Sequence, residues 1–151
     1  MKIQLVKESD AQKMLEVALE AFAEDAEKYG SPPPKIDTLE WRHPRQYNGI
    51  YYKLLLEDEI IGGFRIINKG DGHYYFASAF ITPQYQNRGY GSEVMKFIDK
   101  EFSNVKKWTL DTPYKSYRNH YFYEKHGFVK HDEVKPVPKN DFTLFLYEKI
   151  M

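Results

Sequence analysis

One stretch decides how the chain is expected to fold: Phe80-Ile-Thr-Pro-Gln-Tyr-Gln-Asn-Arg-Gly-Tyr-Gly-Ser-Glu-Val-Met-Lys-Phe97. Residues 73–81, which lead into it, are rich in aromatic and β-branched side chains and predict a strand. Pro83 ends that strand, residues 86–91 form a short loop with two glycines, and helical periodicity begins at Ser92. The sequence therefore predicts a strand, a glycine loop and a helix N-terminus in succession.

Such a loop is a natural anion-binding site. Glycines let the backbone approach a ligand closely, and the N–H groups of a first helical turn have no partner within the helix. The helix dipole adds a partial positive charge and Arg88 adds a full one, so we expect the loop to hold a pyrophosphate. The pattern Gln86-x-x-Gly89-x-Gly91 fits neither a P-loop, which needs a lysine, nor the Gly-x-Gly-x-x-Gly dinucleotide fingerprint.

Composition limits the class of protein. The 151 residues are about one domain, and 42% hydrophobic residues are enough for a core. Lys+Arg and Asp+Glu are both 22, and this balance argues against a nucleic-acid partner. The absence of cysteine excludes disulfides, zinc–thiolate sites and a cysteine nucleophile, and the five histidines show no metal-ligand spacing.

The N-terminal segment lacks the apolar core of a signal peptide, and no apolar run is long enough to span a membrane. We therefore expect a cytoplasmic protein without a membrane partner, either a monomer or a homodimer.

The remaining elements follow from hydrophobic periodicity. A strand at 2–6 precedes a helix that runs to about residue 28 and opens with a capping box of Ser9 and Gln12. Later elements are expected in this order: a weak helix at 37–47, strands at 50–56, 60–67 and 73–81, a helix from 92, a strand at 107–111, a helix from 114 or 116 to Gly127, and strands at 128–131 and 142–147. This order predicts an α/β fold, a mixed sheet with helices on both faces, in a single domain over residues 1–151.

A second motif, Phe122-Tyr-Glu-Lys-His-Gly-Phe128, describes a helix end capped by glycine that turns into a strand. With Gln86-x-x-Gly89-x-Gly91 it resembles the two signatures of the GCN5-related N-acetyltransferase (GNAT) family, and the element order is similar to that family over essentially the whole chain. The resemblance implies a mostly antiparallel sheet splayed at its fourth and fifth strands, 73–81 and 107–111. It also implies that acetyl-coenzyme A, the acyl donor, binds where these strands part.

The resemblance further implies individual site residues. Backbone groups at the end of strand 73–81 would bond the pantetheine arm, and backbone N–H groups of the loop would hold the pyrophosphate. Tyr123 stands at the position of the family's general acid. The family often has Asn where this chain has Ser116, so a cofactor role passes to Ser116 and Asn119 together. The implied cofactor-binding set is Ala79, Phe80, Ile81, Gln86, Asn87, Arg88, Gly89, Tyr90, Gly91, Ser92, Ser116 and Asn119.

The implied reaction is direct transfer of an acetyl group to a primary amine of a small molecule or peptide within a ternary complex. The general base is not evident, and the acidic candidates are Asp111, Glu24 and Asp25. His126, in the last turn of its helix, is expected to be a charge partner of the helix C-terminus.

The amine is expected to enter between residues 29–34 and 41–47, where the aromatic side chains of Tyr29, Trp41 and Tyr47 could line a pocket. The alternative reading is a module of the same fold that binds an acyl-coenzyme A without turnover.

Overall fold

The computed structural model describes residues 1–29, 49–136 and 141–151, with the backbone alone at 24–26 and 28–29. Its strands form one seven-stranded sheet in the order β1-β2-β3-β4-β5-β7-β6, in which β4 and β5 are parallel and all other neighbours are antiparallel. The strands are β1 Lys2–Leu5, β2 Ile50–Leu56, β3 Glu59–Gly70, β4 His73–Ile81, β5 Lys107–Pro113, β6 Val129–Val134 and β7 Leu144–Ile150. The predicted fold class is confirmed.

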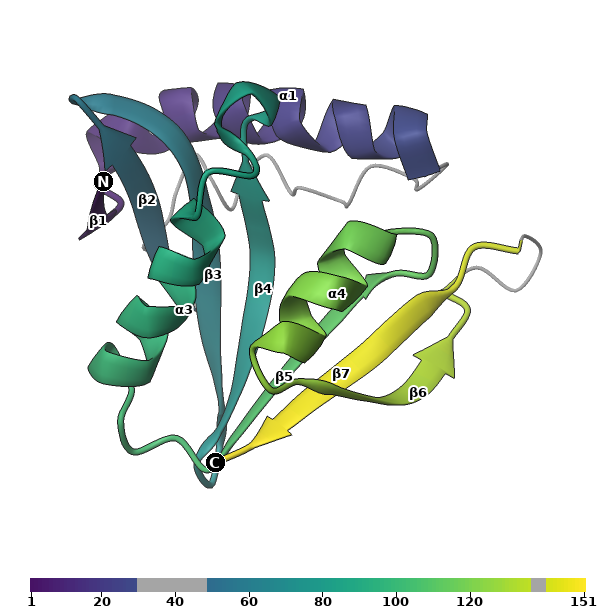
Figure 1. The fold of residues 1–151 in the computed structure, drawn as a ribbon. Coiled ribbons are helices and arrows are strands. Elements are labelled where there is room, and N and C mark those ends of the chain that lie inside the picture. Colours follow the sequence, from purple (N-terminus) through teal and green to yellow (C-terminus); the bar gives the residue numbers. More distant parts are fainter. Residues whose placement is uncertain (30–48, 137–140) are drawn as a thin grey trace.

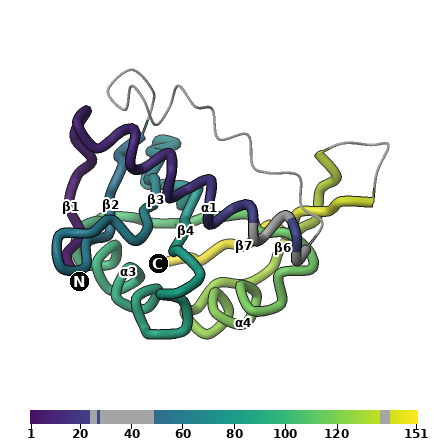
Figure 2. Tube along the Cα trace, turned by 90° about the horizontal axis from the view of Figure 1, so that it is seen from above, coloured from purple at the N-terminus to yellow at the C-terminus, as the bar shows by residue number. Residues whose placement is uncertain are grey.

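Helices cover both faces of the sheet (Figures 1 and 2). The helix α1 (Ala11–Tyr29) packs on one face, where Met14 and Phe22 join a buried cluster with Tyr51 and Phe80. On the other face, α3 (Tyr90–Glu101) and α4 (Tyr117–Lys125) cover a larger cluster centred on Trp108. Amphipathic helices bury their apolar stripes in this way, which accounts for most of their stability.

The first helix begins differently from the prediction. A short 3₁₀ turn, η1 (Glu8–Asp10), leads into α1, and the Asp10 carboxylate accepts bonds from the Lys7 backbone N–H at 2.9 Å and from Lys53 Nζ at 2.6 Å. The predicted Ser9–Gln12 capping box does not form, because the acceptor at this helix start is Asp10.

A bulge interrupts β4 in the middle of the strand. Ser78 has a φ of 52°, and the register with β3 moves from Arg65↔Ala77 to Gly63↔Phe80, so β4 carries an extra residue there. After an extra residue, the following side chains of a strand point to the opposite face of the sheet. Consequently Phe76 lies on the α3 face with Phe64, at 5.5 Å between ring centroids, while Phe80 lies on the α1 face with Phe22, also at 5.5 Å.

The pairing of β4 with β5 is short. It covers His73↔Lys107, Tyr74↔Trp108 and Tyr75↔Thr109 and then stops, although both strands continue. From there the two strands diverge, as Figure 1 shows above the common starting point of β4 and β5. The predicted splay between the fourth and fifth strands is therefore present, and the bulge lies just beyond its origin.

Within the described part of the chain, no helix combines the length and the apolar character that crossing a membrane would require.

Candidate active site

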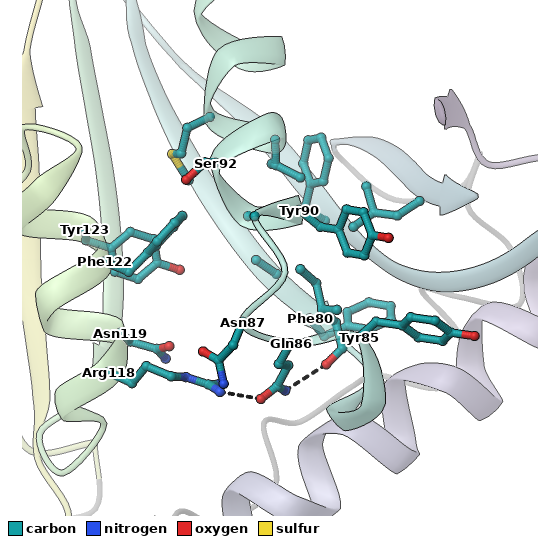
Figure 3. A pocket seen from close by; sticks show the side chains of 18 of the residues that line it. Phe80, Tyr85, Gln86, Asn87, Tyr90, Ser92, Arg118, Asn119, Phe122 and Tyr123 are labelled. Atoms are coloured by element: carbon teal, nitrogen blue, oxygen red, sulfur yellow. Dashed lines mark hydrogen bonds between the residues drawn. The ribbon is translucent and has the colours of Figure 1, made fainter. Parts of the chain in front are cut away.

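A cavity of about 300 Å³ occupies the splay. Its walls come from the end of β4, the glycine loop with the start of α3, and the facing side of α4 (Figure 3). Its lining includes eleven of the predicted site residues: Ala79, Phe80, Ile81, Gln86, Asn87, Gly89, Tyr90, Gly91, Ser92, Asn119 and Tyr123. The structure thus brings together, from three separate elements, most of the residues that the sequence motifs selected.

The glycine loop ends in an open helix N-terminus. Asn87 and Gly89 both adopt left-handed backbone conformations, with φ of 62° and 85°. The N–H of Glu93 makes the first helical bond, to the Gly89 carbonyl at 3.2 Å. The N–H groups of Tyr90, Gly91 and Ser92 precede that bond and so have no partner within the helix. This is the donor arrangement that an anionic ligand requires.

Gly91 has a packing role in addition to its place in the loop. A Cβ at this position would lie 3.0 Å from the ring of Phe122. The absent side chain thus lets α3 and α4 approach closely and sets the width of the cavity between them. Around the Cβ position of Gly89, by contrast, there is open space, and its positive φ is the reason for glycine there.

The helix α4 carries the polar groups of the opposite wall. The half-buried Tyr123 packs its ring against Phe122 and Phe128, with ring centroids at 5.4 and 5.8 Å. Asn119 donates to Thr112 Oγ1 at 3.3 Å, which ties α4 to β5. The Tyr123 ring is therefore fixed by aromatic contacts at the cavity wall, as a positioned proton donor requires.

Gln86 does not project freely into the cavity. Its amide nitrogen donates to the Ile81 carbonyl at 2.9 Å, and its amide oxygen accepts from Arg118 (Figure 3). The Ile81 carbonyl, one of the backbone groups expected to bond a pantetheine arm, therefore already accepts one hydrogen bond from a side chain of the same loop.

Several predicted site residues lie away from this cavity. Arg88 does not line it, and its guanidinium sits 5.7 Å from the centroid of the Tyr85 ring. Ser116 is buried and is the N-cap residue directly before α4. Asp111 is exposed and accepts a hydrogen bond from the Tyr75 hydroxyl. The other candidates lie outside the described residues or side chains: Glu24, Asp25, Tyr29, Trp41 and Tyr47.

Tyr75 and Asp111 form a polar pair where β4 and β5 part, on the sheet face opposite to Phe76 and Leu110. Burial and the neighbouring Asp111 carboxylate raise the pKa of Tyr75, and Arg65 acts against this rise. The Tyr75 hydroxyl therefore stays protonated and donates a hydrogen bond to the Asp111 carboxylate. Arg65 also donates to Ser78 Oγ at 3.4 Å and so braces the bulge from the same face.

His126 has a different role from the predicted one. Its Nε2 lies 3.1 Å from Ser92 Oγ, and its ring packs on Phe122 at 4.7 Å between centroids. Burial, together with Lys125 and Lys149, lowers the pKa of His126 below its ordinary value. A histidine with a lowered pKa is mostly neutral at pH 7, so His126 connects α4 to α3 and is not a charge partner of the helix end.

Among the cavity-lining residues that were not predicted from the sequence, two are charged: Arg118 and Lys125, both on α4. Their helical spacing to Phe122 places them on its cavity side, but the sequence alone does not show which face of α4 meets the loop. Among the described residues, no three histidine, aspartate or glutamate side chains come together in a way that could hold a metal ion.

The comparison with known families agrees with this geometry. The family model described as the acetyltransferase (GNAT) domain matches residues 47–130, more than half of the chain, including both motifs. This chain belongs to the GNAT acetyltransferase family.

The individual proteins that resemble this chain have low sequence identity to it. The uncharacterized protein YrkN of Bacillus subtilis (strain 168) is 28% identical over 136 residues, or 83% of this chain and 71% of YrkN. The PaiA N-acetyltransferase of Thermoplasma acidophilum, solved in complex with coenzyme A, superposes with a TM-score of 0.80 at 14% identity, covering 99% of this chain and 98% of that one. A GNAT family acetyltransferase of Elizabethkingia anophelis, solved with acetyl-CoA bound, gives 0.64 at 23% identity, covering 81% and 93%.

Proposed function

We propose that the protein is an N-acetyltransferase that transfers the acetyl group of acetyl-CoA to a primary amine by direct attack in a ternary complex. One observation carries this proposal: the splayed strands open into a cavity where the open N-terminus of α3 faces Tyr123 of α4. The first supplies donors for a diphosphate, and the second supplies a proton donor at the same cavity. The coenzyme A and acetyl-CoA complexes of the two structural relatives support the choice of donor.

Each wall of the cavity has a part in this reaction. Acetyl-CoA supplies an activated thioester, and the open backbone N–H groups of Tyr90, Gly91 and Ser92 hold its phosphates. The backbone N–H near Ile81, at the bulged end of β4, would polarise the thioester carbonyl and stabilise the oxyanion. Tyr123 gives its proton to the departing thiolate.

The amine must lose a proton before it can attack, because an alkyl ammonium has no free electron pair. Among the acidic candidates, the one with a described side chain is Asp111; it lies outside the cavity lining, is oriented by the Tyr75 hydroxyl where β4 and β5 part, and would take the proton through a bridging water. The bond from Tyr75 occupies one carboxylate oxygen, Oδ2, and leaves the other for that water.

The test is release of free thiol from acetyl-CoA by the purified protein with a panel of amines: polyamines, aminoglycosides, amino acids, peptides with a free N-terminus and lysine peptides. Mass spectrometry of the product and its resistance to hydroxylamine identify an amide. Tight acetyl-CoA binding without thiol release from any amine would favour the alternative, a sensor of acyl-coenzyme A. Absence of acetyl-CoA binding would refute both.

A further inference from the structure

The cavity has an unbalanced charge. The whole chain carries 22 basic and 22 acidic residues, yet the described residues that line the cavity include two cations, Arg118 and Lys125, and no Asp or Glu. Both cations come from α4, on the wall opposite the glycine loop. The open end of α3 adds partial positive charge from the other side. An anion that enters the cavity would therefore meet positive potential from both walls.

The contact of Arg118 leaves its charge uncompensated. Its hydrogen-bond partner within the described chain is the side chain of Gln86, a neutral amide. The direction of that amide is fixed, because the Ile81 carbonyl can only accept and must face the amide nitrogen. The Gln86 oxygen is then left for Arg118, which can only donate. Arg118, Gln86 and Ile81 form a continuous chain of hydrogen bonds from α4 to the end of β4.

We propose that Arg118 recognises the diphosphate of acetyl-CoA from α4, and that Gln86 holds the Arg118 guanidinium in position to do so. This inference rests on the proposed function, since it takes acetyl-CoA as the ligand. The loop N–H groups contact the diphosphate from one side and the Arg118 guanidinium contacts it from the other.

The chemistry of the guanidinium suits this role. Arg118 is exposed, and one of its N–H groups points at Gln86 while the planar fork has four more. A guanidinium–phosphate contact is charge-assisted, about twice as strong as a hydrogen bond between two neutral groups, and can be bidentate. Arg88, the cation that the sequence places inside the loop, has turned away onto Tyr85. The two arginines are therefore a matched pair, with equal charge and a different position relative to the cavity.

Calorimetry on the purified protein tests the proposal with Arg118→Gln and Arg88→Gln, using acetyl-CoA and S-acetylpantetheine, which lacks the diphosphate. Arg118→Gln is expected to weaken acetyl-CoA about 10- to 100-fold, the range for a hydrogen bond to a charged group, and to leave S-acetylpantetheine unchanged. Arg88→Gln is expected to change the affinity for acetyl-CoA less than about threefold, as an exposed charge outside the cavity should. Equal melting temperatures of the variants confirm that the fold is retained.

Two further arms make the assignment specific. With dephospho-CoA, which keeps the diphosphate and lacks the 3′-phosphate, the loss caused by Arg118→Gln should be the same; a loss that disappears would assign Arg118 to the 3′-phosphate and overturn the proposal. Gln86→Met should weaken acetyl-CoA in the wild-type background and have no further effect in the Arg118→Gln background. Additive losses would overturn the positioning role of Gln86.

Four other outcomes are decisive. Equal small losses for Arg118→Gln and Arg88→Gln would show a general charge effect and refute a specific contact. An equal loss for S-acetylpantetheine would show that Arg118 only braces the cleft. A wild-type protein that binds no acetyl-CoA at all would refute the proposed function, whereas wild-type binding with an unaffected Arg118→Gln variant would refute this inference alone.

Discussion

At the scale of single residues, the proposed chemistry depends on one hydroxyl. The Tyr123 ring contacts Phe122, Phe128 and Tyr147, so the aromatic ring has a structural role that is separable from the hydroxyl. A thiolate is a fairly good leaving group, because thiols ionise near pH 8.5, and a proton donor should therefore help only moderately. Removal of the oxygen alone separates the two roles.

Tyr123→Phe is expected to keep the melting temperature and the affinity for acetyl-CoA and to lower kcat by about 10- to 10³-fold, around the range of general acid catalysis. Steady-state kinetics beside calorimetry give both quantities. Tyr121→Phe is the control, since Tyr121 is 73% exposed on the same helix and should have wild-type kcat. A wild-type kcat for Tyr123→Phe, under conditions where chemistry limits turnover, would leave Tyr123 as a packing residue only.

The role of the glycine loop can be tested by comparing the same substitution at Gly89, in the loop, and at Gly70, outside it. Both have positive φ, 85° and 94°, and both have open space around the position of a Cβ. A substitution at either site carries a similar backbone strain, about 1–2 kcal/mol. Gly89→Glu is expected to lose more than about 100-fold in acetyl-CoA affinity, because a carboxylate then stands at the open end of α3.

Gly70→Glu, at the turn between β3 and β4, should show the same modest loss of thermal stability with unchanged affinity. Similar affinities for the two variants, measured by calorimetry, would mean that acetyl-CoA does not use the glycine loop.

At the scale of elements, the cavity depends on the distance between α3 and α4. Gly91→Val is expected to lower stability by about 1–3 kcal/mol, the usual cost of overpacking, because its Cβ meets the Phe122 ring. The double variant Gly91→Val with Phe122→Ala should recover part of that loss, since the contact is then relieved. Chemical denaturation gives the free energies; strictly additive losses would show that Phe122 is not what restricts Gly91.

The elements also show which features the sequence could predict. Strand and helix types followed from periodicity and from Pro83, and the glycine loop followed from local chemistry. The bulge at Ser78 was not predictable, because neither Ser78 nor Ala79 gives the usual glycine signal. The motif pointed to Arg88, which lies inside it, and gave no signal for Arg118, because the side chains that meet across a cavity depend on how two helices pack.

At the scale of the whole molecule, stability should depend on pH through a histidine between two helices. His126 lies against Ser92, and the charged groups around it are Lys96 and Asp99 of α3, Lys125 of α4 and Lys149 of β7. Its pKa is lowered in the folded chain, so below pH 6.5 the unfolded chain binds more protons. This contribution to stability is present above pH 6.5 and is lost as the pH falls through the folded pKa. Burial also lowers the pKa of His73, which acts in the same direction.

His126→Gln is therefore expected to reduce the drop in melting temperature between pH 7.5 and pH 5, by about 1–3 °C at this chain length. His131→Gln is the control, because His131 is exposed on β6. Thermal scans across this pH range measure the effect. If the melting temperature of His126→Gln depends on pH as in the wild type, another titrating group causes the loss of stability at low pH.

The short backbone pairing between β4 and β5, called the seam below, affects how the chain unfolds locally. The pairing covers three residue pairs, so the two halves of the sheet are joined by a narrow strip of backbone hydrogen bonds. Antiparallel ladders hold each half internally, β1 to β4 on one side and β5, β7 and β6 on the other. Amide hydrogens along the seam should therefore exchange with deuterium sooner than those inside either half. The molecule would then behave as two cooperative units whose backbone pairing ends at Tyr75 and Thr109. A ligand bound in the splay would contact both units and hold them together.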